Sequence, residues 1–176
     1  AIRCRSHIQR APTGHLHDDQ LAIDLVYRGW DILSDVGTGV YTADLDRRNN
    51  FRSISRHNTA SPIGEERYAH DTSPSALFTL KQTGETQGEM TNPNQFLGFH
   101  RRGRVLHERY VELTANELKI TDRITGASAW QGSYVLAPGV GCEINHEDKS
   151  VTLSTTDFSV EVRFQPPPPS ITTSRI

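Results

Sequence analysis

Leu118-Lys119-Ile120-Thr121-Asp122-Arg123-Ile124 alternates apolar and polar residues, with Leu118, Ile120 and Ile124 at positions of the same parity. Successive side chains of a β-strand point to opposite faces, so this stretch predicts a strand with one buried face. The same alternation recurs at residues 21–28, 151–153 and 160–164. It is typical of antiparallel sheets that pack one face on a core and solvate the other.

Turn-forming pairs separate these stretches, which makes the predicted strands short. They are Arg28-Gly29, Arg102-Gly103, Thr125-Gly126, Pro138-Gly139 and Glu147-Asp148. The pattern predicts an all-β fold, an antiparallel two-sheet β-sandwich with one short helical segment near 43–52. We expect the sandwich to occupy residues 1–165. The four prolines at 166–169 can neither continue a helix nor donate to a sheet, so residues 166–176 are expected to form an extended tail.

The composition excludes some classes of protein. The 176 residues carry a formal net charge of −2, which gives no overall basic excess for binding nucleic acid. No apolar run approaches the roughly 20 residues that span a bilayer. The chain opens at Ala1 in what reads as a strand of a longer protein, so a leader upstream is not visible. Cys4 and Cys142 are expected to be two separate thiols.

The stretch between Gly14 and Thr59 carries the chemistry. His17, Asp35 and His57 offer two imidazoles and one carboxylate, a set that suits a borderline-soft divalent ion such as zinc. A hairpin that turns at Arg28-Gly29 would return Asp35 close to His17. From the residues alone, another interpretation stays open: two surface histidines, and an aspartate that forms a turn before Gly37.

Three ordered blocks here carry a family pattern. They are Gly14-His15-Leu16-His17-Asp18-Asp19, then Asp35-Val36-Gly37 followed by Tyr41, then Phe51-Arg52 and His57-Asn58-Thr59. The blocks resemble the heparinase II/III-like domain of polysaccharide lyases, which include heparinases and alginate lyases. A weaker similarity continues through His107-Glu108-Arg109 and Ile120-Thr121-Asp122. One departure is that Gly39-Val40 shifts the register of Tyr41 from the family's turn tyrosine.

The resemblance implies a C-terminal β-domain in which His17, Asp35 and His57 bind zinc as a structural clip. It makes His15 a catalytic wall of the substrate cleft, and Arg52 and Tyr41 candidates for substrate contacts. It also implies cleavage of an anionic, uronic-acid-containing polysaccharide by β-elimination. The catalytic Tyr and Asn would come from an N-terminal α/α toroid, so this chain alone is expected to be inactive. The family's usual setting makes the protein periplasmic or secreted.

Two other functions stay open. One is a non-catalytic carbohydrate-binding or interface module that keeps the fold and the zinc. The other is a hydrolase in which zinc activates water and His15 shuttles protons.

For several further residues we favour a structural or solvent-exposed role over a functional one. The basic cluster from Phe99 to Arg109 is expected to be a solvated hairpin turn rather than a sugar-binding surface. The isolated histidines are taken as surface or strand residues, and the two tryptophans as packed in the core. These are His70, His100, His146, Trp30 and Trp130.

Overall fold

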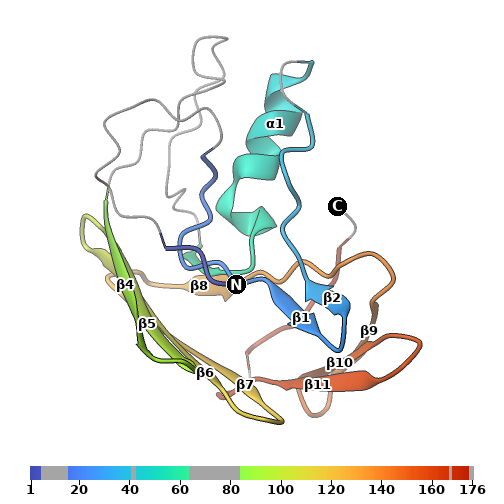
Figure 1. Ribbon diagram of the computed structural model, residues 1–176. Helices are drawn as coiled ribbons and strands as arrows, with labels where there is room; N and C mark the ends of the chain where they lie inside the picture. Colours follow the sequence, from blue (N-terminus) through green and yellow to red (C-terminus); the bar gives the residue numbers. More distant parts are fainter. Residues whose placement is uncertain (5–15, 41–42, 64–83, 167, 175–176) are drawn as a thin grey trace. The chain divides into compact units, whose positions relative to one another are not determined.

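The computed structural model describes residues 1–4, 16–40, 43–63, 84–166 and 168–174 (Figure 1). The chain divides into two compact units, Ala1–Val135 and Leu136–Ile176, and each is described by itself. The elements are β1 (Leu25–Tyr27), β2 (Trp30–Leu33), α1 (Leu45–Arg52), η1 (Ile54–Arg56), β3 (Ala60–Pro62), β4 (Glu85–Asn92), β5 (Gln95–Arg102), β6 (Val105–Leu113), β7 (Leu118–Thr125), β8 (Trp130–Gly132), β9 (Gly141–Asn145), β10 (Ser150–Ser154) and β11 (Ser159–Arg163).

The predicted fold class is confirmed. The described residues form several antiparallel sheets and one short α-helix, an all-β composition consistent with a β-sandwich. The helix spans Leu45–Arg52, inside the segment 43–52 that the sequence indicated. Its N-cap is Asp44, whose side chain accepts a hydrogen bond from the Arg47 backbone N–H at 2.9 Å. The predicted boundary between a domain at 1–165 and a tail at 166–176 stays a prediction.

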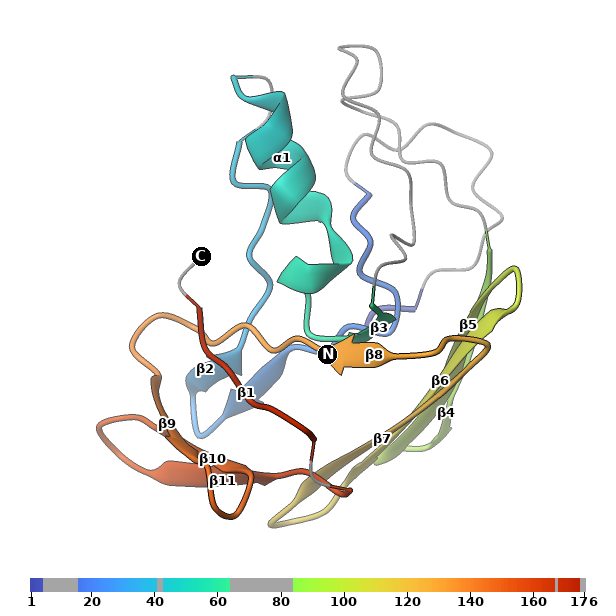
Figure 2. The same ribbon diagram turned by 180° about the vertical axis from the view of Figure 1, so that it is seen from behind.

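The largest sheet of the first unit joins β4, β5, β6 and β7 in chain order. Figure 2 shows this curved sheet from behind. Phe96 of β5 and Val111 of β6 bury one face of the sheet against Leu21. A Cβ at Gly98 would lie 2.7 Å from the Phe96 ring and 2.9 Å from Leu21 Cδ2, so glycine permits this close packing. The segment just after His17 is thereby seated directly on the sheet.

The β1–β2 hairpin turns where the sequence predicted. Arg28 and Gly29 have φ angles of +51° and +82°, as a two-residue hairpin of this twist requires. The strand predicted at residues 21–28 is wrong in its extent, because β1 covers only Leu25–Tyr27. Leu21 has a φ of +62° and interrupts the extended chain, so the buried Leu21 and Ile23 lie outside the strand.

The second unit contains a three-stranded antiparallel sheet in the order β11-β10-β9. Val151 and Leu153 of β10 are buried, and they face Val162 and Val160 of β11 across the sheet. The alternation predicted here is confirmed, as it is in β7, where half-buried and exposed residues alternate throughout. Cys4 lies in the first unit and Cys142 in the second, and both thiols are free.

Candidate metal centre

Three segments of the first unit bring together the side chains predicted to bind zinc. His17 precedes Leu21, whose φ is positive, Asp35 follows β2, and His57 directly follows the short 3-10 helix η1. One possible ligand atom from each residue lies within 4.8 Å of the other two. The predicted convergence of these side chains is therefore present in the fold, and their role as ligands stays a prediction.

The imidazole rings of His17 and His57 are buried, and each has a nitrogen atom that makes no hydrogen bond to the described residues. His17 and His57 are 6% and 1% exposed, and their ring centroids lie 5.2 Å apart. Nδ1 of His57 lies 3.0 Å from Oδ2 of Asp35. Within the described part of the chain, the Nε2 atoms of His17 and His57 are both buried and have no hydrogen-bond partner. A buried unpaired polar atom costs about 1–3 kcal/mol, so two such atoms in a group of side chains that includes a carboxylate fit a site for a cation.

The charge states also suit a metal. Burial and, to a smaller extent, the nearby His57 together lower the pKa of His17 to about 4, so this imidazole is neutral at neutral pH. Burial alone would raise the pKa of Asp35. Hydrogen bonds from His57, Arg3 and the Gly37 backbone N–H outweigh that effect and hold the pKa well below its usual range. Neutral imidazole and ionised carboxylate are the forms that bind zinc.

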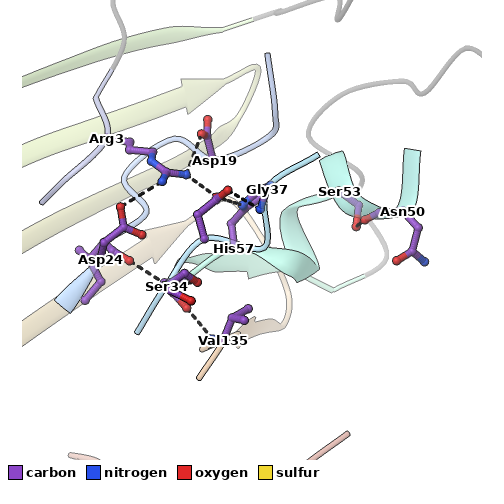
Figure 3. Close-up of polar contacts among 12 residues, drawn as sticks. Arg3, Asp19, Asp24, Ser34, Gly37, Asn50, Ser53, His57 and Val135 are labelled. Atoms are coloured by element: carbon purple, nitrogen blue, oxygen red, sulfur yellow. Dashed lines mark hydrogen bonds and ion pairs between the residues drawn. The ribbon is translucent and has the colours of Figure 1, made fainter. Parts of the chain in front are cut away.

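Arg3 is a site residue that the sequence analysis missed. Its guanidinium donates to Oδ2 of Asp35, the same oxygen that faces His57. It also donates to Asp24 at 3.0 Å and lies 3.4 Å from Asp19 (Figure 3). A signal was present in the sequence, because Asp18, Asp19 and Asp24 follow His17 with no lysine or arginine between Leu16 and Tyr27. A cation from elsewhere in the chain would balance them.

The two residues after His57 tie the ligand segments together. The Asn58 side-chain amide donates to the carbonyls of Ile23 at 2.8 Å and Ser34 at 3.2 Å. Its oxygen accepts from the Val135 backbone N–H at 2.5 Å. The Thr59 hydroxyl donates to the Gln20 carbonyl at 3.1 Å. The run His57-Asn58-Thr59 therefore supplies one candidate ligand and two cross-links to the segments that carry the others.

The interpretation of residues 99–109 as a solvated turn is wrong for His100, His107 and Arg109, which are all buried. His107 and Arg109 are 1% and 0% exposed, on the buried face of β6. Both contact Asp122 of β7, with each shortest distance at 2.7 Å. Arg101 and Arg104, nearer the turn, are exposed as expected.

The remaining predicted residues have varied outcomes. His15 and Tyr41 lie outside the described residues, as does His70. Arg52 is 2% exposed, and its predicted substrate contact stays a prediction. His100 is a buried strand histidine whose Nδ1 lies 2.7 Å from the Thr86 hydroxyl, and His146 is exposed. The prediction that both tryptophans pack in the core is wrong for Trp130, which is 53% exposed on the short strand β8. Trp30 is half-buried.

In the described part of the chain, no helix combines the length and apolar character that crossing a membrane requires. A family model described as heparinase II/III-like, C-terminal, matches residues 2–175. The search of curated proteins and the search of solved structures gave no significant match.

Proposed function

The chain belongs to the heparinase II/III-like C-terminal family, and from this premise we propose that it is the zinc-bearing domain of a polysaccharide lyase. The proposal rests on one observation above all. Among the described residues, the buried imidazoles of His17 and His57 have Nε2 atoms without a hydrogen-bond partner, and one nitrogen of each ring lies within 4.8 Å of a carboxylate oxygen of Asp35. These three residues would hold the metal.

Zinc would act here as a structural clip. When bound, it supplies a charge and a set of directed bonds that hold three ligand segments at fixed positions. In this chain those segments begin at His17, Asp35 and His57, which are far apart in the sequence. His15 lies two residues before His17, so fixing the His17 segment would also fix the position from which His15 meets substrate.

The reaction we propose is β-elimination on a uronic-acid-containing polysaccharide. A base removes the proton at C5 of the uronate, and a donor must neutralise the adjacent carboxylate before the carbanion-like state is accessible. An acid then protonates the leaving glycosidic oxygen. The tyrosine and the asparagine for these steps would come from an N-terminal α/α toroid, and His15, Arg52 and Tyr41 would line the cleft from this domain. Such a protein would act in the periplasm or outside the cell.

A second function, a non-catalytic carbohydrate-binding module with the same zinc clip, is supported by Trp130. This aromatic side chain is 53% exposed and could stack on a sugar ring. The ultraviolet absorbance of an unsaturated product separates the two functions. The full-length protein should generate it from a uronic-acid polysaccharide if the protein is a lyase, and a binding module should not.

Metal content of the purified chain tests the zinc site. We expect about one zinc per chain in the wild type by elemental analysis, and less than a tenth of that in His17→Ala, because one of three protein ligands is lost. The matched control is His146→Ala, which removes an exposed histidine of the second unit and should leave the zinc content unchanged. A wild-type chain without metal, or a His17→Ala chain that keeps it, contradicts the proposal.

A further inference from the structure

Arg109 is a buried cation far from the candidate ligands in the sequence, but it reaches the segments that carry two of them. We infer that Arg109 is a positioning residue for the metal centre, holding the His17 and His57 segments at the separation that the ion needs. The inference rests on the proposed zinc site and names a residue on which that site depends.

The Arg109 guanidinium is anchored to the sheet on one side. Its Nε donates to Oδ1 of Asp122 at 2.7 Å, and its Nη2 donates to Oδ2 at 2.7 Å. This two-point pairing of β6 with β7 fixes the plane of the guanidinium. His107 Nε2 lies 2.7 Å from the same Oδ1 and holds the carboxylate in place. Burial raises the pKa of Asp122, but its contacts with Arg109 and His107 outweigh burial and hold that pKa well below its usual range.

The remaining face of the guanidinium points away from Asp122 and binds the ligand segments. The Nη1 of Arg109 donates to the Leu21 carbonyl at 2.8 Å and to the Asn58 carbonyl at 2.9 Å. Leu21 lies four residues after His17, and Asn58 directly follows His57. One nitrogen therefore joins the two histidine segments, and Asp122 fixes that nitrogen relative to the sheet.

The backbone at Leu21 supports this assignment. Its φ of +62° is a conformation that L residues rarely adopt, and such strain persists only where surrounding contacts impose it. The Leu21 backbone N–H donates to the Arg3 carbonyl at 2.7 Å, and its carbonyl accepts from Arg109. The two bonds hold both sides of this residue, so the direction in which the chain leaves His17 depends in part on Arg109.

Lysine cannot replace this arrangement, because its ammonium is a point charge without a planar fork. Arg109→Lys keeps the charge next to Asp122 but loses the simultaneous contacts to both carbonyls. Outer contacts of this kind change metal affinity about 10- to 100-fold when they are removed. We expect Arg109→Lys to bind zinc about 10- to 100-fold more weakly than the wild type in competition with a chromogenic chelator. The absorption spectrum of the cobalt-substituted protein should also change, since cobalt reports ligand geometry.

The matched control is Thr86→Val. It removes another buried side-chain hydrogen bond of the same sheet, the one between the Thr86 hydroxyl and His100. This bond does not involve the segment after His17 or the segment after His57. We expect its zinc affinity to stay within about two-fold of the wild type, with an unchanged cobalt spectrum, even if its stability falls.

Instability of Arg109→Lys does not prevent the comparison. In that event urea brings Thr86→Val to the same unfolded fraction, and the zinc concentration that restores half of the folded signal is compared. A higher concentration for Arg109→Lys supports the inference, and equal concentrations overturn it. A folded Arg109→Lys with wild-type affinity and spectrum overturns it as well. Failure of the wild type to bind zinc would instead refute the proposed function, so the two failures are distinguishable.

Discussion

Two clusters in the first unit share an aspartate, a histidine and an arginine, and they differ in the buried polar atoms that they leave unpaired. In each, an aspartate accepts from a histidine and an arginine: Asp35 from His57 and Arg3, Asp122 from His107 and Arg109. Each carboxylate has a pKa held below its usual range by these partners. Residue types alone therefore do not distinguish a metal site from a structural ion pair.

The difference is whether buried donors and acceptors remain unused. In the Asp122 cluster, no buried side-chain nitrogen or oxygen of the three residues lacks a hydrogen-bond partner. In the Asp35 cluster, a second histidine lies alongside, and the Nε2 atoms of both histidines are buried with no hydrogen-bond partner among the described residues. The Asp122 cluster is therefore a closed cluster, whose buried polar atoms are all hydrogen-bonded. The Asp35 cluster is an open one, which has buried nitrogen atoms available to bind one further group. The unpaired buried atoms, rather than the charges, therefore mark the candidate metal site.

The largest contrast is expected from removing each aspartate's charge in metal-free protein. Asp122→Asn leaves the fully buried Arg109 guanidinium without its counter-ion, which should cost about 3–5 kcal/mol of unfolding free energy. Asp35→Asn should cost about 1 kcal/mol or less, because the Arg3 and Asp35 side chains are 26% and 20% exposed. Urea unfolding followed by tryptophan fluorescence measures both, since Trp30 and Trp130 lie in the first unit. Equal losses would mean that the two clusters are not distinct in kind.

The same contrast explains what the sequence revealed and what it did not. Alternation at residues 118–124 predicted β7, and glycine at position 29 predicted the hairpin turn, because both signals are local. The convergence of His17, Asp35 and His57 followed from the hairpin and from the family pattern. These features need only short-range geometry or a recognisable motif.

Long-range contacts explain the failures. Leu21 adopts a positive φ because atoms from Arg3 and from Arg109 hold its peptide groups, and no local pattern contains that information. The sequence predicts a solvated Arg109 because charged residues are usually exposed. One available signal was parity: His107 and Arg109 share the alternation of the apolar Val111, which places all three on one face of the strand.

A second, smaller contrast is expected from acid in the metal-free protein. His17 has a folded pKa of about 4 against 6.5 for an exposed imidazole, so between these values the unfolded chain binds more protons. Stability should therefore fall as pH drops from about 6.5 to 4, by up to roughly 3 kcal/mol from this group. The pKa of the Asp122 carboxyl is lowered well below its usual range, so Asp122 stays ionised between pH 6.5 and 4. Its contribution to the unfolding free energy is therefore lost only in stronger acid.

His17→Gln should flatten that pH dependence, because glutamine does not titrate. The measurement is the urea midpoint of tryptophan fluorescence at several pH values, for wild type and variant after chelation. Parallel curves for the two proteins would show that His17 is not the group responsible. Restoring zinc should suppress the wild-type slope, because a bound ion excludes the proton from the imidazole.

The smallest expected effect is on zinc affinity, which substitutions of Arg3 and Arg109 should change in opposite directions. Arg3 donates to the candidate ligand Asp35 itself, so its positive charge opposes a divalent ion at the same oxygen. Arg3→Met should strengthen zinc binding by about 1 kcal/mol, roughly five-fold, and the gain should shrink with added salt. Arg109→Lys is expected to weaken zinc binding, so the two variants should move affinity in opposite directions. The control is Arg123→Met, whose side chain is 75% exposed on β7 and which should leave the affinity unchanged. If Arg3→Met instead weakens zinc binding at every salt concentration, then Arg3 orients Asp35 for the ion, and the open cluster depends on its arginine as the closed one does.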